Sequence, residues 1–215
     1  MAAFFQGLDL SILTMRIIPI LICLTIHELS HGAVAFALGD NTAKEQGRLT
    51  LNPIKHIDPV GLVFMFFFRF GWAKAVPVNM YNFKNPKFGM AITALAGPIS
   101  NFLLAMLIFI FQLPLLTRYA GGSVVAEIIL MTGVISVFLG VFNLLPIPPL
   151  DGSKIVNSLL PNRYYYRVLQ YERYGMLLLL ALVWLGVLAG PLQGLMDGAL
   201  DLFLSITNPI SRLLF

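Results

Sequence analysis

The chain has 215 residues, of which 58% are hydrophobic and 11% are charged, against about 45–50% and about 25% in soluble proteins. A soluble globule of this size could not bury so much apolar surface, so the composition indicates an integral membrane protein. A single cysteine, Cys23, excludes an internal disulfide and a disulfide-rich secreted domain. The net charge of +4 comes without a basic cluster beside stacking aromatics, so we expect no nucleic-acid partner.

Long apolar stretches predict several transmembrane helices. A bilayer core requires about 20 apolar residues, and four stretches satisfy this length: residues 16–38, 89–113, 124–145 and 175–195. The apolar run 59–68 is too short to cross a full bilayer at about 1.5 Å per residue. We expect it either as a short span in a thinned bilayer or as a re-entrant segment.

The polar segments between these stretches have other patterns. Residues 47–53 alternate like a strand and end at a proline, and the turn-rich segment 72–88 is typical of a small hairpin or a loop. The tail places Asp197 and Asp201 on one helical face, which favours an interfacial amphipathic helix or a final short span.

Together these patterns predict an all-α membrane protein. We expect a polytopic bundle of about five to six transmembrane segments, with a small membrane-associated β-hairpin region and a possible re-entrant segment. Residues 1–215 are expected to form one domain, with a C-terminal span and amphipathic tail over 175–215.

Basic residues are distributed unevenly around the spans. Three lysines precede the span at 89–113 and four basic residues follow the span at 124–145, whereas the connector between them carries only Arg118. Cytoplasmic loops carry an excess of Lys and Arg. The two basic groups are therefore predicted to be cytoplasmic: Lys74, Lys84, Lys87, Lys154, Arg163, Arg167 and Arg173.

A cluster of ionisable residues, His27-Glu28-Leu29-Ser30-His31, interrupts the first predicted span. Residues four apart on a helix share a face, with Cβ atoms about 5–6 Å apart, so both imidazoles can reach one Zn²⁺. Glu28 is rotated by about 100° from His27, which leaves it free to act as general base and proton donor. The alternatives are a polar helix-packing network or a metal site without catalysis.

Two histidines need a third protein ligand if a fourth position is to stay open for water. Most acidic residues lie in loops, near the start or in the tail. Asp151, however, closes an apolar segment in which three prolines prevent a helix. Non-helical backbone at membrane depth is tolerated only where it is buried or lines a wet cavity. We therefore predict Asp151 as the third ligand, with the N-cap of a helix beginning near Ser153 as its alternative role.

Several motifs now resemble one known family. Residues 27–32 (HELSHG), 96–101 (AGPISN) and 143–152 (NLLPIPPLDG) resemble the site-2 protease family of intramembrane zinc metalloproteases. Residues 47–61 and 71–79 are similar to its small prokaryotic branch, and the match covers about residues 16–160. The chain has no room for the PDZ domain of larger members, so the membrane core and short loops would select substrates.

The resemblance implies roles for individual residues. His27, His31 and Asp151 would bind one zinc ion per chain, and Glu28 would be the catalytic acid and base. Asn143 would stabilise the oxyanion or hold the substrate.

Two further polar residues have open roles. Asn101 either packs neighbouring helices or supports a zinc ligand through a hydrogen bond. For His56, which lies in a loop similar to the family pattern, a structural or gating role is favoured over metal contact.

The predicted function is that of a zinc endopeptidase in the cell membrane. It would cleave transmembrane proteins within or near their membrane helices, with water reaching the site from the cytoplasmic side. The rival hypothesis is a divalent-metal transporter that uses the same His and Asp ligands. A transporter is expected to offer several acidic or histidine sites along its pathway, whereas this chain offers one cluster and Asp151.

Overall fold

The computed structural model describes residues 10–68, 71–112, 114–115 and 123–215. Its longest elements are helices: α2 (Leu10–Ala37), α5 (Pro86–Ile110), α7 (Val124–Asn143) and α11 (Ala189–Leu214). The shorter helices are α3 (Thr42–Glu45), α4 (Pro59–Phe68), α8 (Asp151–Ser158), α9 (Asn162–Tyr171) and α10 (Gly175–Trp184). Three 3₁₀ turns complete the order: η1 (Pro53–His56), η2 (Met80–Asn82) and η3 (Glu172–Tyr174).

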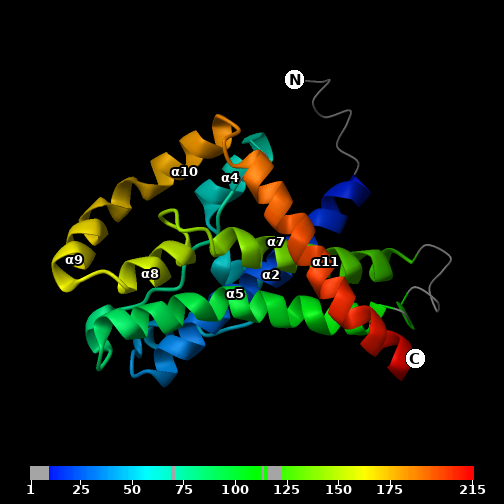
Figure 1. Cartoon of the computed structure of the whole chain (residues 1–215), viewed down its shortest axis with the longest axis horizontal. Helices are drawn as coiled ribbons and strands as arrows, with labels where there is room; N and C mark the ends of the chain where they lie inside the picture. Colours follow the sequence, from blue (N-terminus) through cyan, green and yellow to red (C-terminus); the bar gives the residue numbers. More distant parts are fainter. Residues whose placement is uncertain (1–9, 69–70, 113, 116–122) are drawn as a thin grey trace.

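Helices α2, α5 and α7 pack against one another, and α11 contacts both α5 and α7. Figure 1 shows α5 and α7 running along the long axis, with α11 crossing them and α8 to α10 forming an arch at the other end. Small and apolar residues of α5 and α7 are buried where these helices meet, and Phe203 of α11 packs against this cluster. The rings of Phe203 and Phe102 lie 5.6 Å apart between centroids.

Three described helices are long and apolar enough to cross a membrane: Ile17–Ala37, Pro86–Ile110 and Val124–Asn143. A bent pair, Asn162–Trp184 with Ala189–Leu214, raises the number to four if it forms one span. The prediction of five to six spans is therefore not supported by the described residues. Helix α4 has 10 residues, or about 15 Å of rise, and is too short to count.

The apolar stretch over residues 175–195, expected as a span, is not one continuous helix in the structure. Helix α10 ends at Trp184 and α11 begins at Ala189, with an angle of 89° between the two segments. Gly186 lies at the break with φ +70°, a conformation that glycine adopts without a Cβ clash. The amides of Gly186 and Val187 bond back to the carbonyls of Val183 and Leu182, which satisfies the end of α10.

The predicted β-hairpin is also wrong. The described part of the chain holds a single isolated bridge, Ile57 with Ala73, and no strand. Asparagine side chains explain the difference, because Asn52 and Asn79 accept hydrogen bonds from the amides of Ile54 and Tyr81 and cap 3₁₀ turns. Locally satisfied backbone of this kind competes with strand pairing. The segment 71–79 is nevertheless extended around Asn79.

Helix α5, which walls the site described below, begins where its sequence dictates. The Asn85 side chain accepts a hydrogen bond from the amide of Phe88, and Pro86 occupies the first helical position.

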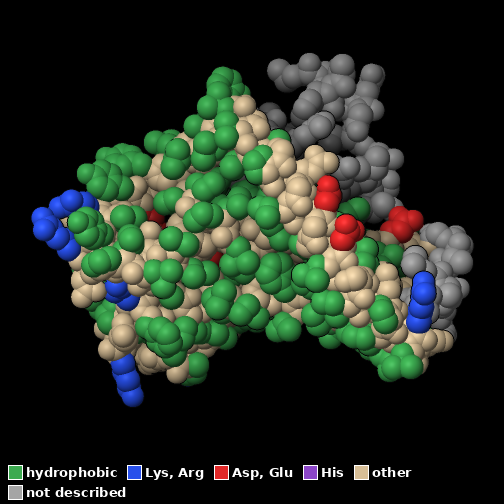
Figure 2. Space-filling model, in the orientation of Figure 1, with side chains coloured by type: hydrophobic (Ala, Val, Ile, Leu, Met, Phe, Trp, Pro, Cys, Tyr) green, Lys and Arg blue, Asp and Glu red, His purple; other side chains and the backbone are tan. Residues whose placement is uncertain are grey.

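The outer surface is rich in exposed large hydrophobic side chains, among them Leu103 and Leu107 of α5 and Leu177 of α10. Figure 2 shows hydrophobic side chains over much of the visible face, with most of the Lys and Arg side chains gathered at one end, near α9. An apolar belt with charges at the ends is the surface that a lipid bilayer requires.

Candidate metal centre

Helix α2 places two imidazoles side by side within the membrane-spanning part of the chain. His27 and His31 are 4% and 8% exposed, and their Nε2 atoms lie 3.0 Å apart. The four-residue spacing puts both rings on one helix face. The HExxH motif therefore brings its two imidazoles together as its spacing predicts.

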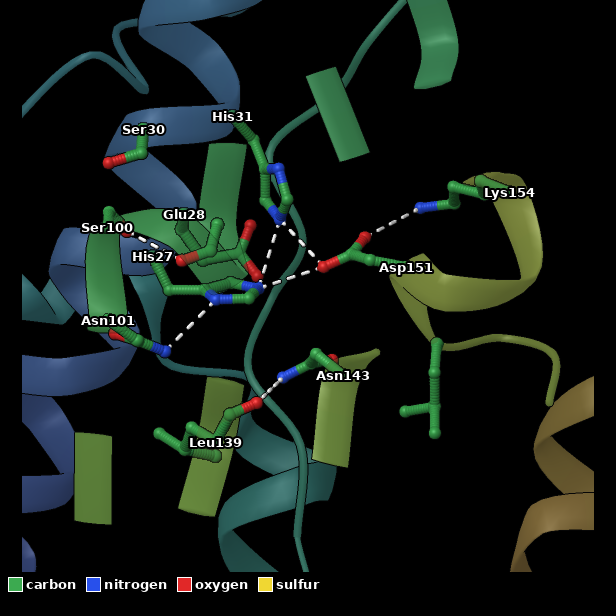
Figure 3. Close-up of polar contacts among 12 residues, drawn as sticks. His27, Glu28, Ser30, His31, Ser100, Asn101, Leu139, Asn143, Asp151 and Lys154 are labelled. Atoms are coloured by element: carbon green, nitrogen blue, oxygen red, sulfur yellow. Dashed lines mark hydrogen bonds and ion pairs between the residues drawn. The ribbon is translucent and has the colours of Figure 1, made fainter. Parts of the chain in front are cut away.

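Asp151 reaches the same point from a distant part of the sequence. It is the first residue of α8 and follows a stretch of turns over residues 144–150. Its Oδ2 lies 3.1 Å from Nε2 of His27 and 3.1 Å from Nε2 of His31. Figure 3 shows the three side chains converging from α2 and α8. The prediction that the proline-rich stretch is not helical is confirmed.

The spacing of these atoms fits a zinc ion. Tetrahedral zinc with bonds of about 2.0–2.1 Å requires about 3.3 Å between ligand atoms. The three observed separations of 3.0–3.1 Å differ from that by a few tenths of an ångström. His27, His31 and Asp151 are also the one group of three or more potential ligands found among the described residues.

The hydrogen bond of His31 leaves its Nε2 free to bind a metal. Its Nδ1 lies 2.7 Å from the carbonyl oxygen of Thr93, which can only accept, so Nδ1 carries the proton. Nε2 therefore keeps its lone pair and points toward Asp151 and His27. This arrangement is the usual one for a metal-binding histidine.

Asn101 performs the equivalent task for His27. The Asn101 side chain is fully buried, its Nδ2 lies 3.2 Å from Nδ1 of His27, and its Oδ1 has no partner. Exchanging the two amide atoms, which are nearly equal in shape, lets Oδ1 accept the Nδ1 proton and removes the unpaired oxygen. Nε2 of His27 is then available to a metal. The buried Asn101 oxygen without a partner therefore supports the fit of these residues to a zinc ion.

A glycine lets α5 approach the two imidazoles. A Cβ added to Gly97 would lie 2.5 Å from Cε1 of His27 and 2.5 Å from Nε2 of His31. No side chain larger than hydrogen fits at this position without displacing the rings or α5.

The two oxygens of Asp151 have different neighbours. Oδ2 faces the histidines, whereas Oδ1 lies 3.5 Å from Nζ of Lys154, one helical turn later. The net shift of the Asp151 pKa is downward: burial raises it, and the nearby charge of Lys154 lowers it. The ionised carboxylate can serve as a ligand.

Glu28 lies beside this group, and its carboxylate is held by backbone. It is 8% exposed, and its Oε2 accepts a hydrogen bond from the Val76 amide at 2.7 Å. Glu28, the three candidate ligands and Asn143 line one cavity of about 480 Å³. Water and a peptide therefore have space beside the candidate metal site.

The other polar residues singled out in the sequence have varied positions. Asn143 lines the cavity, but its Nδ2 donates to the carbonyl of Leu139 in its own helix at 3.0 Å. His56 lies outside the ligand group, and its Nε2 is 2.9 Å from the carbonyl of Thr50.

Sequence reasoning missed the roles of Thr93 and Val76 because both act through backbone atoms, which no residue type signals. Lys154 was detectable from its three-residue spacing from Asp151.

A second cavity of about 670 Å³ adjoins the first. Both cavities share the side chains of Leu24, Leu139 and Phe142, which come from α2 and α7. The second cavity extends along the apolar faces of these helices, toward Ile17 and Ile135.

Comparison with known proteins agrees with the chemistry of the site. The model of peptidase family M50 matches residues 115–186. The chain is 40% identical over 219 residues to "Putative zinc metalloprotease YwhC" of Bacillus subtilis, covering 96% of this chain and 98% of that protein. It is 28% identical over 193 residues to "Putative zinc metalloprotease Rip2" of Mycobacterium tuberculosis, covering 85% and 71%. No solved structure matches.

The fold and site define a multi-pass membrane protein with a zinc metalloprotease centre. The chain belongs to peptidase family M50, the site-2 protease family, and is a zinc-dependent hydrolase of peptide bonds.

Proposed function

We propose that this chain is an intramembrane endopeptidase, which hydrolyses peptide bonds within or next to the transmembrane helices of other membrane proteins. The observation that carries this proposal is the position of the candidate centre. His27 and His31 belong to a helix that is long and apolar enough to cross a membrane, as are α5 and α7, which wall the cavity.

Three side chains hold the metal in this proposal: His27 and His31 through Nε2 and Asp151 through Oδ2. Bound zinc would supply a Lewis acid that polarises the scissile carbonyl and lowers the pKa of water to about 7. Asn101 and the Thr93 carbonyl keep the imidazoles in the required tautomer. Gly97, Lys154 and the buried surroundings keep the three ligand atoms close together.

Glu28 moves the protons. Its carboxylate takes a proton from the attacking water and later delivers it to the leaving amine. Because Val76 holds Oε2, Oε1 is the oxygen that takes the proton. The cavity beside Glu28 has room for the substrate carbonyl.

For Asn143 we propose the role of oxyanion donor or substrate holder. Its place on the cavity wall supports this role. Its Nδ2 bonds to the Leu139 carbonyl, so the amide must exchange that partner for the substrate. A preorganised donor of this kind contributes about 10²–10³-fold to rate, and an amide that first has to exchange contributes less.

The second cavity supports lateral entry of the substrate helix. This mainly apolar cavity, lined by α2 and α7 and also by residues of α4 and of segment 71–73, shares lining with the catalytic cavity and suits a helical segment presented from lipid. We propose that water enters from the cytoplasmic side, because basic residues follow Asp151 at the end of the molecule where α9 lies. The whole chain, residues 1–215, is proposed to act as one domain.

The rival function, divalent-metal transport, receives less support. A transport pathway requires successive polar sites through the membrane. Among the described residues, one group could hold a metal ion, and the adjoining cavity is mainly apolar.

Glu28→Gln tests the proposal in liposomes that contain the purified protein and a model transmembrane substrate. We expect the variant to keep its zinc, measured by atomic emission, and to lose cleavage. Glu127→Gln is the matched control, because it makes the same change in the first turn of α7, away from the cavity. Cleavage by Glu28→Gln at the parent's rate would contradict the proposed mechanism.

A further inference from the structure

The backbone segment 71–79 forms one wall of the catalytic cavity. Trp72, Ala75, Val76 and Val78 line the cavity from this segment, and the Val76 amide donates to Oε2 of Glu28 at 2.7 Å. The side chain of Val76 also packs close to α2, because a Cβ added at Gly32 would lie 3.1 Å from its Cγ1. The position of Glu28 therefore depends on how this segment is held.

A buried carboxylate anchors one end of the segment. Asp40, just beyond α2, is fully buried, and its Oδ2 accepts the amide of Asn79 at 2.7 Å. Its Oδ1 accepts the Asn82 side chain at 2.7 Å and the Thr42 amide at 3.1 Å. Burial raises the pKa of Asp40, but the hydrogen bond from the Thr42 hydroxyl, together with those just named, outweighs burial and holds the pKa below its usual range. A charged acceptor with several donors is a strong anchor.

A buried guanidinium anchors the other side. Arg48 is 7% exposed, and its Nη2 donates to the carbonyls of Lys74 at 2.6 Å and Ala75 at 3.3 Å. The Lys74 amide is in turn bonded to the carbonyl of His56 at 2.9 Å. The chain is thus fixed immediately before Val76 and again three residues after it.

We propose that Asp40 and Arg48 are positioning residues that set the orientation of the Glu28 carboxylate by clamping residues 74–79 on both sides of the Val76 amide. This inference rests on the proposed role of Glu28 as general base. Neither Asp40 nor Arg48 belongs to the described lining of the catalytic cavity, so both act on catalysis through the backbone alone.

The clamp explains the charges of both residues. A charge is costly to bury unless it is hydrogen-bonded. Arg48 uses its charge on two backbone carbonyls of the segment, whereas Asp40 holds the Asn79 amide with one oxygen and Thr42 and Asn82 with the other. Neutral replacements lose these contacts. Asp40→Asn keeps the volume but turns an amide NH2 toward the donors of Asn79 or Asn82, and Arg48→Gln is shorter and no longer reaches the Lys74 carbonyl. The segment then moves, and the Val76 amide with it.

The test compares Asp40→Asn and Arg48→Gln with the parent protein in liposomes. A misplacement of about 1 Å costs up to about a hundredfold in rate. We expect kcat to fall by about tenfold to a hundredfold, with zinc content and KM unchanged. Hydrogen exchange of the peptide that contains Val76 should become faster. Glu45→Gln, an exposed carboxylate in the neighbouring α3, is the control that keeps parental kinetics.

Provided that Glu28→Gln is inactive, two results would contradict the proposal that Asp40 and Arg48 position Glu28. One is a kcat of both variants equal to that of the Glu45→Gln control. The other is a loss of zinc in proportion to kcat, which would mean general damage to the fold. If Asp40→Asn does not fold, Arg48→Gln and its conservative partner Arg48→Lys, which should retain part of the rate, carry the test. Activity of Glu28→Gln itself would instead contradict the proposed function.

Discussion

Gly97→Ala is the substitution whose effect the geometry defines most sharply. Glycine inside a helix is less stable than alanine by about 0.5–1 kcal/mol, so helix propensity alone predicts that the variant is more stable. The new Cβ would, however, lie 2.5 Å from both His27 and His31. Ordinary carbon contacts lie at about 3.5–4.0 Å, so α5 or the rings must move by roughly 1 Å.

The expected result is a protein that binds zinc poorly. Overpacking of this kind costs about 1–3 kcal/mol, and the cost falls on the zinc-bound state because a metal holds both rings in place. A cost of about 2 kcal/mol weakens zinc binding by about 30-fold, and a displacement of about 1 Å lowers the rate by up to about a hundredfold.

The assay is titration of zinc against a competing chelator, followed by cleavage in the presence of saturating zinc. Gly198→Ala is the matched control, because Gly198 lies in α11 and a Cβ there meets nothing within 4 Å. We expect the control to bind zinc as the parent does and to be slightly more stable. If Gly97→Ala had the zinc affinity and activity of the parent, the close packing of α5 against the two imidazoles could not be as described.

Three other changes have defined outcomes. Asn101→Ala removes the partner of His27 Nδ1 and should weaken zinc binding by about 10–100-fold; unchanged affinity in a chelator competition would show that His27 needs no such partner. Lys154→Met leaves Oδ1 of Asp151 without its cation, so zinc affinity should fall by about tenfold, less than in Asn101→Ala. Lys154→Arg should restore the affinity. A loss in Lys154→Met equal to that in Asn101→Ala would contradict this ranking. The lowered pKa of Asp40 stabilises the fold above its unfolded pKa of about 3.9, and this contribution disappears as pH falls through the folded pKa. In urea titrations in detergent, Asp40→Asn should therefore be less stable than the parent at pH 7, and the difference in the free energy of unfolding should narrow below about pH 4. A difference that stays constant at all pH values would contradict a lowered pKa of Asp40.

The sequence was sufficient to locate the candidate centre. On a helix, the four-residue spacing of His27 and His31 places both side chains on one face. The prolines before Asp151 exclude a helix from that segment. The structure brings these three residues together, and their role as ligands remains the prediction under test. Glu28 lies beside them on the wall of the same cavity, and its role as acid and base stays a prediction.

The contacts that hold the centre could not be predicted. The Thr93 carbonyl and the Val76 amide are backbone groups, and only the packing of distant segments brings them to His31 and Glu28. Likewise, the spacing of polar residues in 47–53 suggested a strand, whereas asparagine caps turned the backbone locally. Gly186 broke a stretch that hydropathy treats as continuous, because hydropathy ignores backbone conformation.

The most direct test of the central claim is to determine where the protein cuts. Purified parent protein, loaded with zinc in liposomes, is incubated with a single-span substrate, and the products are sequenced by mass spectrometry. The account predicts a zinc-dependent cut inside or at the edge of the membrane segment, absent in Glu28→Gln although that variant retains zinc. Cuts confined to the water-exposed domains of the substrate, or cleavage that survives in Glu28→Gln, would contradict it.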